Sequence, residues 1–163
     1  MSSPLAAYRR RLEAGDLTPD ADQARAAERL DALAEMLKRW NPDAWLGKGA
    51  PPRGLYLWGP VGRGKSLLLD LFFEAAPVKK KRRVHFHEFM LAQHAAMRDA
   101  RAAGAGQDQL ITQAAKRVAN GAQLLCFDEV QVTDIADAMI LGRLFERLFE
   151  NNVTIVATSN RPP

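Results

Sequence analysis

The chain has 163 residues, of which 47% are hydrophobic, so it can bury a core, and extensive disorder is excluded. Its formal net charge of +4 permits an anionic partner such as a nucleotide, a nucleic acid or an acidic lipid, without requiring one. Cys126 is the single cysteine, so no intrachain disulfide forms and a cytoplasmic location is expected. No apolar run approaches the roughly 20 residues of a membrane-spanning helix.

The N-terminal third of the chain is predicted to be helical and to end in a loop. Apolar residues at helical spacing predict helices over residues 5–14 and 20–40. The run NPDAWLGKGAPPRG, residues 41–54, is rich in proline and glycine and predicts a loop. We therefore divide the chain into N-terminal helices with a linker, residues 1–53, and a core domain, residues 54–163.

In the core domain, predicted strands alternate with predicted helices. Strands are expected at residues 55–58, 82–89, 123–127 and 153–158. Helices are expected over residues 65–75, 89–103 and 108–119, and again from an N-cap at Thr133. This alternation predicts an α/β three-layer sandwich around a parallel sheet, which binds ligands at the carboxyl ends of its strands.

Residues 59–66 match the phosphate-binding pattern GxxxxGK[ST]. The eight residues are Gly59, Pro60, Val61, Gly62, Arg63, Gly64, Lys65 and Ser66. Glycines let phosphate oxygens approach backbone N–H groups, and the N-terminus of the following helix favours an anion. Lys65 supplies a positive charge for the β- and γ-phosphates, and Ser66 supplies a hydroxyl ligand for Mg²⁺. The alternative is a turn that merely connects a strand to a helix, but the motif lies where a phosphate loop requires it.

Polar side chains also follow two later strands. Asp128 and Glu129 come after the buried strand, where a P-loop protein carries the acid on the magnesium side. We expect Asp128 to hold Mg²⁺ and Glu129 to act as the general base for the attacking water, although an ordinary helix N-cap region is the alternative. Asn160 follows the fourth strand and either contacts water or the γ-phosphate or simply forms a turn.

Two further features carry less information. The run KKKRR, residues 79–83, is interpreted as a solvated lead-in to an edge strand, with nucleic acid or lipid binding as the alternative. His85 and His87 lie two residues apart and should face the same side of the predicted strand, but no third metal ligand stands at useful spacing.

Three parts of the sequence resemble the AFG-type, or ZapE-like, AAA+ ATPases. They are GLYLWGPVGRGKS, RRVHFHEFM, and CFDEVQVTDIADAMILGRLFERLF with VTIVATSNRPP. The resemblance covers most of residues 54–163, and VHFHEFM and DEVQVTDIADAMIL are far more particular to this family than the phosphate loop. It implies a P-loop AAA+ core that hydrolyses ATP with Mg²⁺, usually as a homo-oligomeric ring. It makes Lys65 and Ser66 Walker A residues, Asp128 and Glu129 Walker B residues, and Asn160 a sensor-1 residue.

The resemblance further implies work in cell division or membrane quality control, with a division or membrane-associated protein as client, in the cytoplasm or peripherally at the inner membrane. The chain departs from the family pattern at Val130, where an aromatic residue is expected. It also ends at Pro163, before the arginine finger, fifth strand and helical lid of that pattern. We therefore expect a partial AAA+ core that is weakly active or inactive alone, with residues 55–58 at an exposed sheet edge.

Two other functions stay open at this point. One is a nucleotide-gated binding module in which turnover is incidental. The other is a helicase-loader-like P-loop protein that grips single-stranded nucleic acid through the basic run at residues 79–83.

Overall fold

A computed structural model describes residues 2–40, 49–62 and 64–163, so most of the loop expected at 41–54 lies outside the described residues. The helices are α1 (Pro4–Glu13), α2 (Ala21–Arg39), α3 (Lys65–Ala75), α4 (Phe86–Ala102), α5 (Gln107–Gly121) and α6 (Ile135–Glu150). The strands are β1 (Leu55–Trp58), β2 (Lys81–His85), β3 (Leu124–Asp128) and β4 (Thr154–Ser159). Among the described helices, none combines the length and apolar character needed to cross a membrane.

The described strands form one parallel sheet in the order β1-β4-β3-β2. Leu55 is in register with Val156, and Leu124 with Thr154. Because every strand runs the same way, the segments that follow β1, β3 and β4 meet at one end of the sheet, where the carboxyl ends of the strands lie. The expected α/β class is confirmed, and so is the edge position of residues 55–58.

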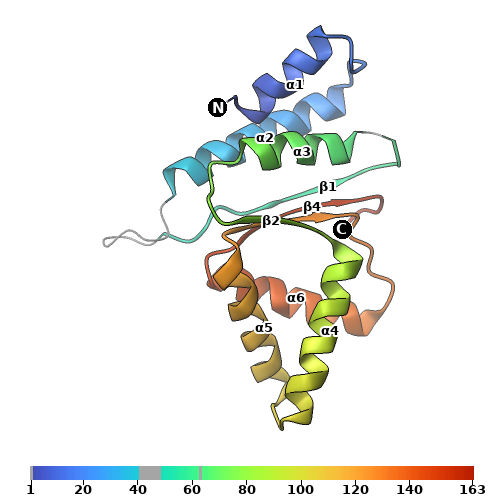
Figure 1. The fold of residues 1–163 in the computed structure, drawn as a ribbon. Helices are drawn as coiled ribbons and strands as arrows, with labels where there is room; N and C mark the ends of the chain where they lie inside the picture. Colours follow the sequence, from blue (N-terminus) through green and yellow to red (C-terminus); the bar gives the residue numbers. More distant parts are fainter. Residues whose placement is uncertain (1, 41–48, 63) are drawn as a thin grey trace.

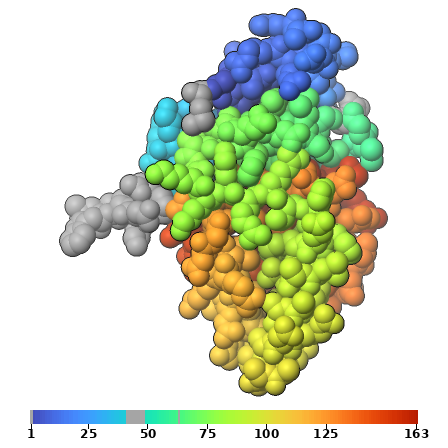
Figure 2. All heavy atoms as spheres, viewed as in Figure 1, coloured from blue at the N-terminus to red at the C-terminus, as the bar shows by residue number. Residues whose placement is uncertain are grey.

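Helices cover both faces of the sheet, which makes the predicted three layers (Figure 1). On one face, α3 lies against the sheet and α1 and α2 pack on α3, around a core that includes Tyr8, Leu30 and Phe72. On the other face, α4, α5 and α6 enclose a second core centred on Phe127. Figure 2 shows α4 and α5, in yellow and gold, lying against each other along this second layer. The N-terminal helices thus share a core with α3.

The structure corrects the predicted second strand, which ends at His85 where α4 begins. Phe86 and Phe89 both place their rings edge-on to Phe127, with ring centroids 5.9 and 4.8 Å away. Three-residue spacing puts two side chains on one face of a helix, whereas alternate residues share a face of a strand. His87 is therefore an exposed helical residue, and the expectation that it shares a strand face with His85 is wrong.

The N-cap of α6 also differs from the prediction. Asp134 is the capping residue, and its Oδ1 accepts a hydrogen bond from the N–H of Ala136 at 2.7 Å. Thr133 lies one residue too early in the chain to serve this helix. Aspartate is a somewhat better cap than threonine, so the prediction ranked these two neighbours incorrectly.

Candidate nucleotide site

The phosphate loop connects the end of β1 to the start of α3, as the motif requires. Gly62 and Gly64 have φ angles of +82° and +75°, which residues with a side chain rarely adopt. A Cβ atom on Gly64 would also lie 2.8 Å from the side-chain nitrogen of Gln23 on α2. The loop therefore needs glycine at both positions for its shape. Arg63, which the motif analysis placed in this loop, lies outside the described residues.

Lys65 is the first residue of α3, and its ammonium group turns back over the loop. Its Nζ donates to the carbonyl oxygens of Gly59 and Pro60, each at 2.8 Å. Burial lowers the pKa of Lys65 below its ordinary value, and the nearby carboxylate of Glu129 opposes that shift. A phosphate oxygen would offer this ammonium a charged acceptor, which makes a stronger hydrogen bond than a neutral carbonyl.

A cavity of about 370 Å³ lies between the loop that follows β1, the residue that follows β3 and the end of β4. Its walls are Val61, Gly62, Gly64, Lys65, Ser66, Leu67, Glu129, Thr158, Ser159 and Asn160. Glu129 and Asn160 follow Lys65 in the chain by 64 and 95 residues, yet they line the same cavity as Lys65. The structure therefore brings together the loop, one member of the acidic pair and the asparagine that the sequence singled out.

Glu129 is held in an unusual backbone conformation by β4. Its φ angle is +55°, in the left-handed region that is uncommon for residues other than glycine. Its N–H donates to Oγ1 of Thr158 at 3.1 Å, and the N–H of Val130 donates to the carbonyl oxygen of Thr158 at 2.7 Å. The hydroxyl of Ser159 in turn donates to the carbonyl oxygen of Val130 at 2.7 Å.

These contacts form a clamp between the end of β4 and the residues after β3. Sequence reasoning missed Thr158 and Ser159, which are buried polar residues at the end of an otherwise apolar strand. That placement was the available signal, since a buried hydroxyl needs a hydrogen-bond partner.

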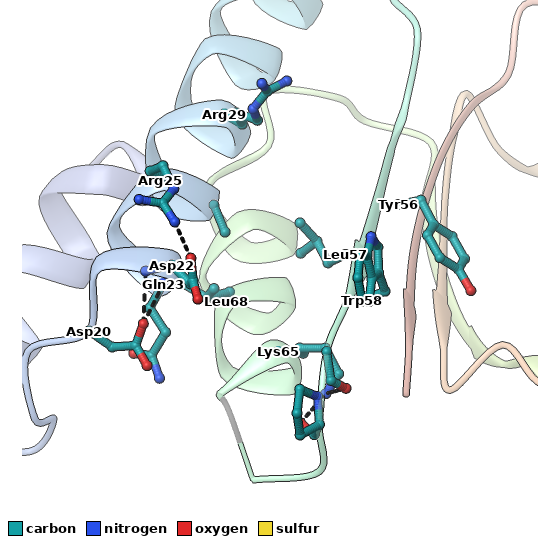
Figure 3. A pocket seen from close by; sticks show the side chains of 13 residues that line it. Asp20, Asp22, Gln23, Arg25, Arg29, Tyr56, Leu57, Trp58, Lys65 and Leu68 are labelled. Carbon is teal, nitrogen blue, oxygen red and sulfur yellow. Dashed lines mark hydrogen bonds and ion pairs between the residues drawn. The ribbon is translucent and has the colours of Figure 1, made fainter. Parts of the chain in front are cut away.

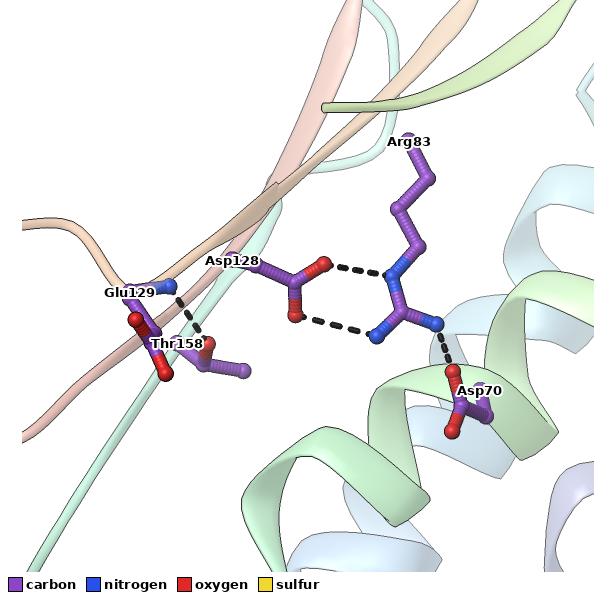
Figure 4. Close-up of polar contacts among 5 residues, drawn as sticks. All are labelled: Asp70, Arg83, Asp128, Glu129 and Thr158. Carbon is purple, nitrogen blue, oxygen red and sulfur yellow. Dashed lines mark hydrogen bonds and ion pairs between the residues drawn. The ribbon is translucent and has the colours of Figure 1, made fainter. Parts of the chain in front are cut away.

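Asp128 ends β3 and is buried, and its partner is Arg83 from the neighbouring strand β2 (Figure 4). Nε of Arg83 donates to Oδ2 of Asp128 at 2.6 Å, and a terminal nitrogen donates to Oδ1 at 3.0 Å. The remaining terminal nitrogen forms an ion pair with Asp70 on α3. Sequence reasoning interpreted Arg83 only as part of a basic run and did not consider Asp70.

A second cavity, of about 470 Å³, lies beside this ion pair. It is lined by Ser66, Arg83, Val84, His85, Asp128 and Glu129. Ser66 and Asp128 present the hard oxygen ligands that Mg²⁺ prefers, and magnesium commonly takes only one or two protein carboxylates and completes its shell with phosphates and water. Within the described residues there is no cluster of three or more His, Cys, Asp or Glu side chains that could hold a metal. Ser66 and Asp128 are thus oxygen donors of the kind and number that a magnesium ion takes from a protein.

A third cavity, of about 480 Å³, lies between α2 and β1 and borders the phosphate loop (Figure 3). Leu57 and Leu68 supply apolar wall, and Lys65 lies at the end that faces the loop. Trp58 also lines it, with 56% of its surface exposed. Such an exposed indole ring offers a flat surface on which another ring system can stack.

Comparison with known proteins decides the family. The family model described as AFG1-like ATPase matches residues 2–163. The chain belongs to the AFG1-like ATPase family. It is 39% identical over 178 residues to the cell division protein ZapE of Escherichia coli strain K12, covering 99% of the chain and 46% of ZapE. It is 46% identical over 123 residues to lactation elevated protein 1 homolog B of Danio rerio, covering 71% of the chain and 24% of that protein. The chain thus spans about half the length of ZapE.

Solved structures with a similar fold include DnaA and the DnaC helicase loader. DnaA of Aquifex aeolicus bound to AMPPCP superposes with a TM-score of 0.60 at 18% identity, covering 90% of this chain and 41% of DnaA. The DnaC helicase loader superposes with a TM-score of 0.61 at 12% identity, covering 90% of this chain and 75% of DnaC. At these identities the likeness concerns the fold alone, which is that of the AAA+ P-loop proteins.

Proposed function

We propose that this AFG1-like chain binds ATP with Mg²⁺ and that its residues hydrolyse the nucleotide. The observation that carries the proposal is the cavity in which the phosphate loop meets Glu129 and Asn160. This cavity brings together a phosphate-binding loop, a carboxylate and an amide. A P-loop enzyme needs these groups to hold a triphosphate and to direct water at it.

The triphosphate would lie on the loop between β1 and α3. Backbone N–H groups of the loop and the N-terminus of α3 favour its negative charge. The ammonium of Lys65 would exchange its two carbonyl acceptors for oxygens of the β- and γ-phosphates. In this proposal residues 54–163 form the nucleotide-binding core and residues 1–53 form the N-terminal helices with their linker. Helix α2 contributes one wall of the site, since its residues line the third cavity.

The base of the nucleotide would occupy the third cavity. This cavity and the phosphate cavity share Lys65, so a ligand could extend from one into the other around the start of α3. Leu57 and Leu68 provide apolar contact for a base, and Trp58 provides an aromatic surface.

Hydrolysis would depend on the groups at the ends of β3 and β4. Glu129, which is exposed and held by the clamp from β4, would take a proton from water, and Asn160 would orient that water or the γ-phosphate. Ser66 and Asp128 would hold Mg²⁺, which when bound stabilises the negative charge that shifts between the phosphates.

The wider role follows by analogy with ZapE, and the chain matches less than half of that protein. We propose that the protein acts as a homo-oligomeric ring in a function connected with cell division, in the cytoplasm or peripherally at the inner membrane. A membrane quality-control function is the corresponding proposal for a membrane-associated client.

Two substitutions test the enzymatic proposal. Lys65→Ala should abolish binding of ATP, measured with a fluorescent analogue, whereas Lys116→Ala on the exposed face of α5 should leave it unchanged. Glu129→Gln should bind ATP normally and lose hydrolysis by about 10²- to 10⁴-fold, the usual contribution of a general base. Glu146→Gln, an exposed charge on α6, is the matched control.

The results separate the alternatives. Wild-type hydrolysis by Glu129→Gln would show that Glu129 is not the base. A protein that binds ATP, does not hydrolyse it, and exerts its full biological effect would instead be a nucleotide-gated binding module.

A further inference from the structure

Arg83 lies between two carboxylates that belong to different layers of the fold. Its guanidinium makes two hydrogen bonds to Asp128 of β3 and an ion pair with Asp70 of α3 (Figure 4). The side chain extends from β2 toward the α3 face of the sheet, as does that of Lys81, whose Nζ donates to the carbonyl oxygen of Phe73 in α3. The guanidinium of Arg83 thus connects the end of β3 with α3, the helix that follows the phosphate loop.

The two carboxylates lie in different environments. The side chain of Asp128 is 9% exposed, whereas that of Asp70 is 48% exposed. A buried carboxylate is costly without a counter-charge, so Asp128 depends on Arg83 whenever no other cation is present. Asp70 is well solvated and can accept or release the guanidinium at little cost.

The proposed function requires Asp128 to face a second cation. The fork of Arg83 engages both oxygens of Asp128, and these are the oxygens through which the carboxylate would hold Mg²⁺ or its water. Two cations close to one carboxylate also repel each other. A divalent ion at Asp128 therefore competes with Arg83.

We propose that Arg83 is a displaceable counter-ion for Asp128. It holds the carboxylate in the metal-free protein, and it withdraws to pair with Asp70 alone when the metal–nucleotide complex binds. Arg83 is then a positioning residue that acts through Asp128, and Asp70 is the partner that receives it. This inference rests on the proposed function, because it assumes that Asp128 serves the metal.

The exchange has a structural consequence. Nucleotide without metal leaves the Arg83–Asp128 contact intact, whereas nucleotide with metal shifts the guanidinium onto α3. Occupation of the metal position is thereby coupled to the interaction between β2 and α3, on the side of the sheet where the N-terminal helices pack.

The test measures how strongly metal improves nucleotide binding. The dissociation constant of a fluorescent, nonhydrolysable ATP analogue is determined in excess Mg²⁺ and in EDTA, and the ratio of the two affinities is the readout. Arg83→Gln should raise this ratio by about three- to tenfold, because the competitor is gone. Asp70→Asn should lower it by a similar factor, because Arg83 loses its second partner. Glu74→Gln, an exposed charge also on α3, should leave the ratio unchanged.

A double substitution separates this exchange from a general effect of charge. If Asp70 acts through Arg83, then Asp70→Asn has no effect in the Arg83→Gln protein. A persistent effect of Asp70→Asn would overturn the proposal, and so would an Arg83→Gln protein whose ratio falls or stays at the wild-type value. Should Arg83→Gln fail to fold, Arg83→Lys keeps the charge without the fork and should raise the ratio by a smaller factor.

Measurements on the wild-type protein distinguish failure of the proposed function from failure of the inference about Arg83. A wild-type protein that binds no analogue in either condition overturns the proposed function and this inference with it. A wild-type protein that binds more tightly with Mg²⁺, beside variants whose ratio matches the wild type, overturns the inference alone.

Discussion

Gly54→Ala should strongly destabilise the fold, because Gly54 lies against the backbone of β4. The residue immediately precedes β1, whose first residue, Leu55, is in register with Val156. A Cβ atom added at Gly54 would overlap the carbonyl oxygen of Ile155 and lie 2.6 Å from its carbonyl carbon. A backbone group cannot rotate away as a flexible side chain can, so β1 must move away from β4.

The size of the effect follows from this geometry. Overpacking in a tight interior costs about 1–3 kcal/mol, and a backbone clash belongs at the upper end of that range or above it. Gly142→Ala provides a matched control, since it adds the same methyl group within α6, where a Cβ atom would meet nothing within 4 Å. There the change should stabilise the protein by about 1 kcal/mol, because alanine is the better helix former.

Urea unfolding followed by circular dichroism measures both changes. With a slope of about 2 kcal/mol per molar urea, Gly54→Ala should lower the midpoint by about 1.5 M and Gly142→Ala should raise it by about 0.5 M. Displacement of β1 also carries Gly59 away from Ser159, whose carbonyl oxygen accepts the N–H of Gly59 at 3.2 Å, so nucleotide affinity should fall. A Gly54→Ala protein with the wild-type midpoint would refute the close approach of these two strands.

Three further predictions each test a single residue. Thr158→Val keeps the shape of a buried side chain but removes the acceptor for the N–H of Glu129, so turnover should fall about tenfold with little change in nucleotide affinity; an equal loss of affinity would contradict a role limited to Glu129. Burial raises the pKa of the Cys126 thiol from 9.0 to about 12, so its contribution to stability is fully present below pH 9 and is lost as the pH rises toward 12. The difference in unfolding free energy between wild type and Cys126→Ala should therefore shift against the wild type by about 1.4 kcal/mol per pH unit above pH 9, and a constant difference would show that the thiol is accessible in the folded state. Asp134→Ala should cost about 1 kcal/mol through loss of the N-cap, whereas Thr133→Ala should have a smaller effect on thermal unfolding.

Several features could be predicted because their signals are local. A phosphate loop binds through consecutive backbone groups, so residues 59–66 identify it without knowledge of the rest of the chain. The unbroken apolar run before Asp128 likewise predicts a central strand, and β3 is buried along its whole length. The boundary at His85 was predicted incorrectly because short apolar segments fit a strand and a helix equally well, and contact with Phe127 selects the helix.

By itself, the sequence determined the order of the elements, the phosphate loop and the acidic pair, since each depends on neighbouring residues. Only the tertiary structure decided what surrounds that pair. Arg83 and Asp128 are 45 residues apart, and Thr158 and Glu129 are 29 residues apart, and each pair meets because its strands are neighbours in the sheet. The physical reason is that parallel neighbours need a long crossover connection, here α4 with α5 between β2 and β3 and α6 between β3 and β4, so side chains that meet across the sheet are far apart in the chain.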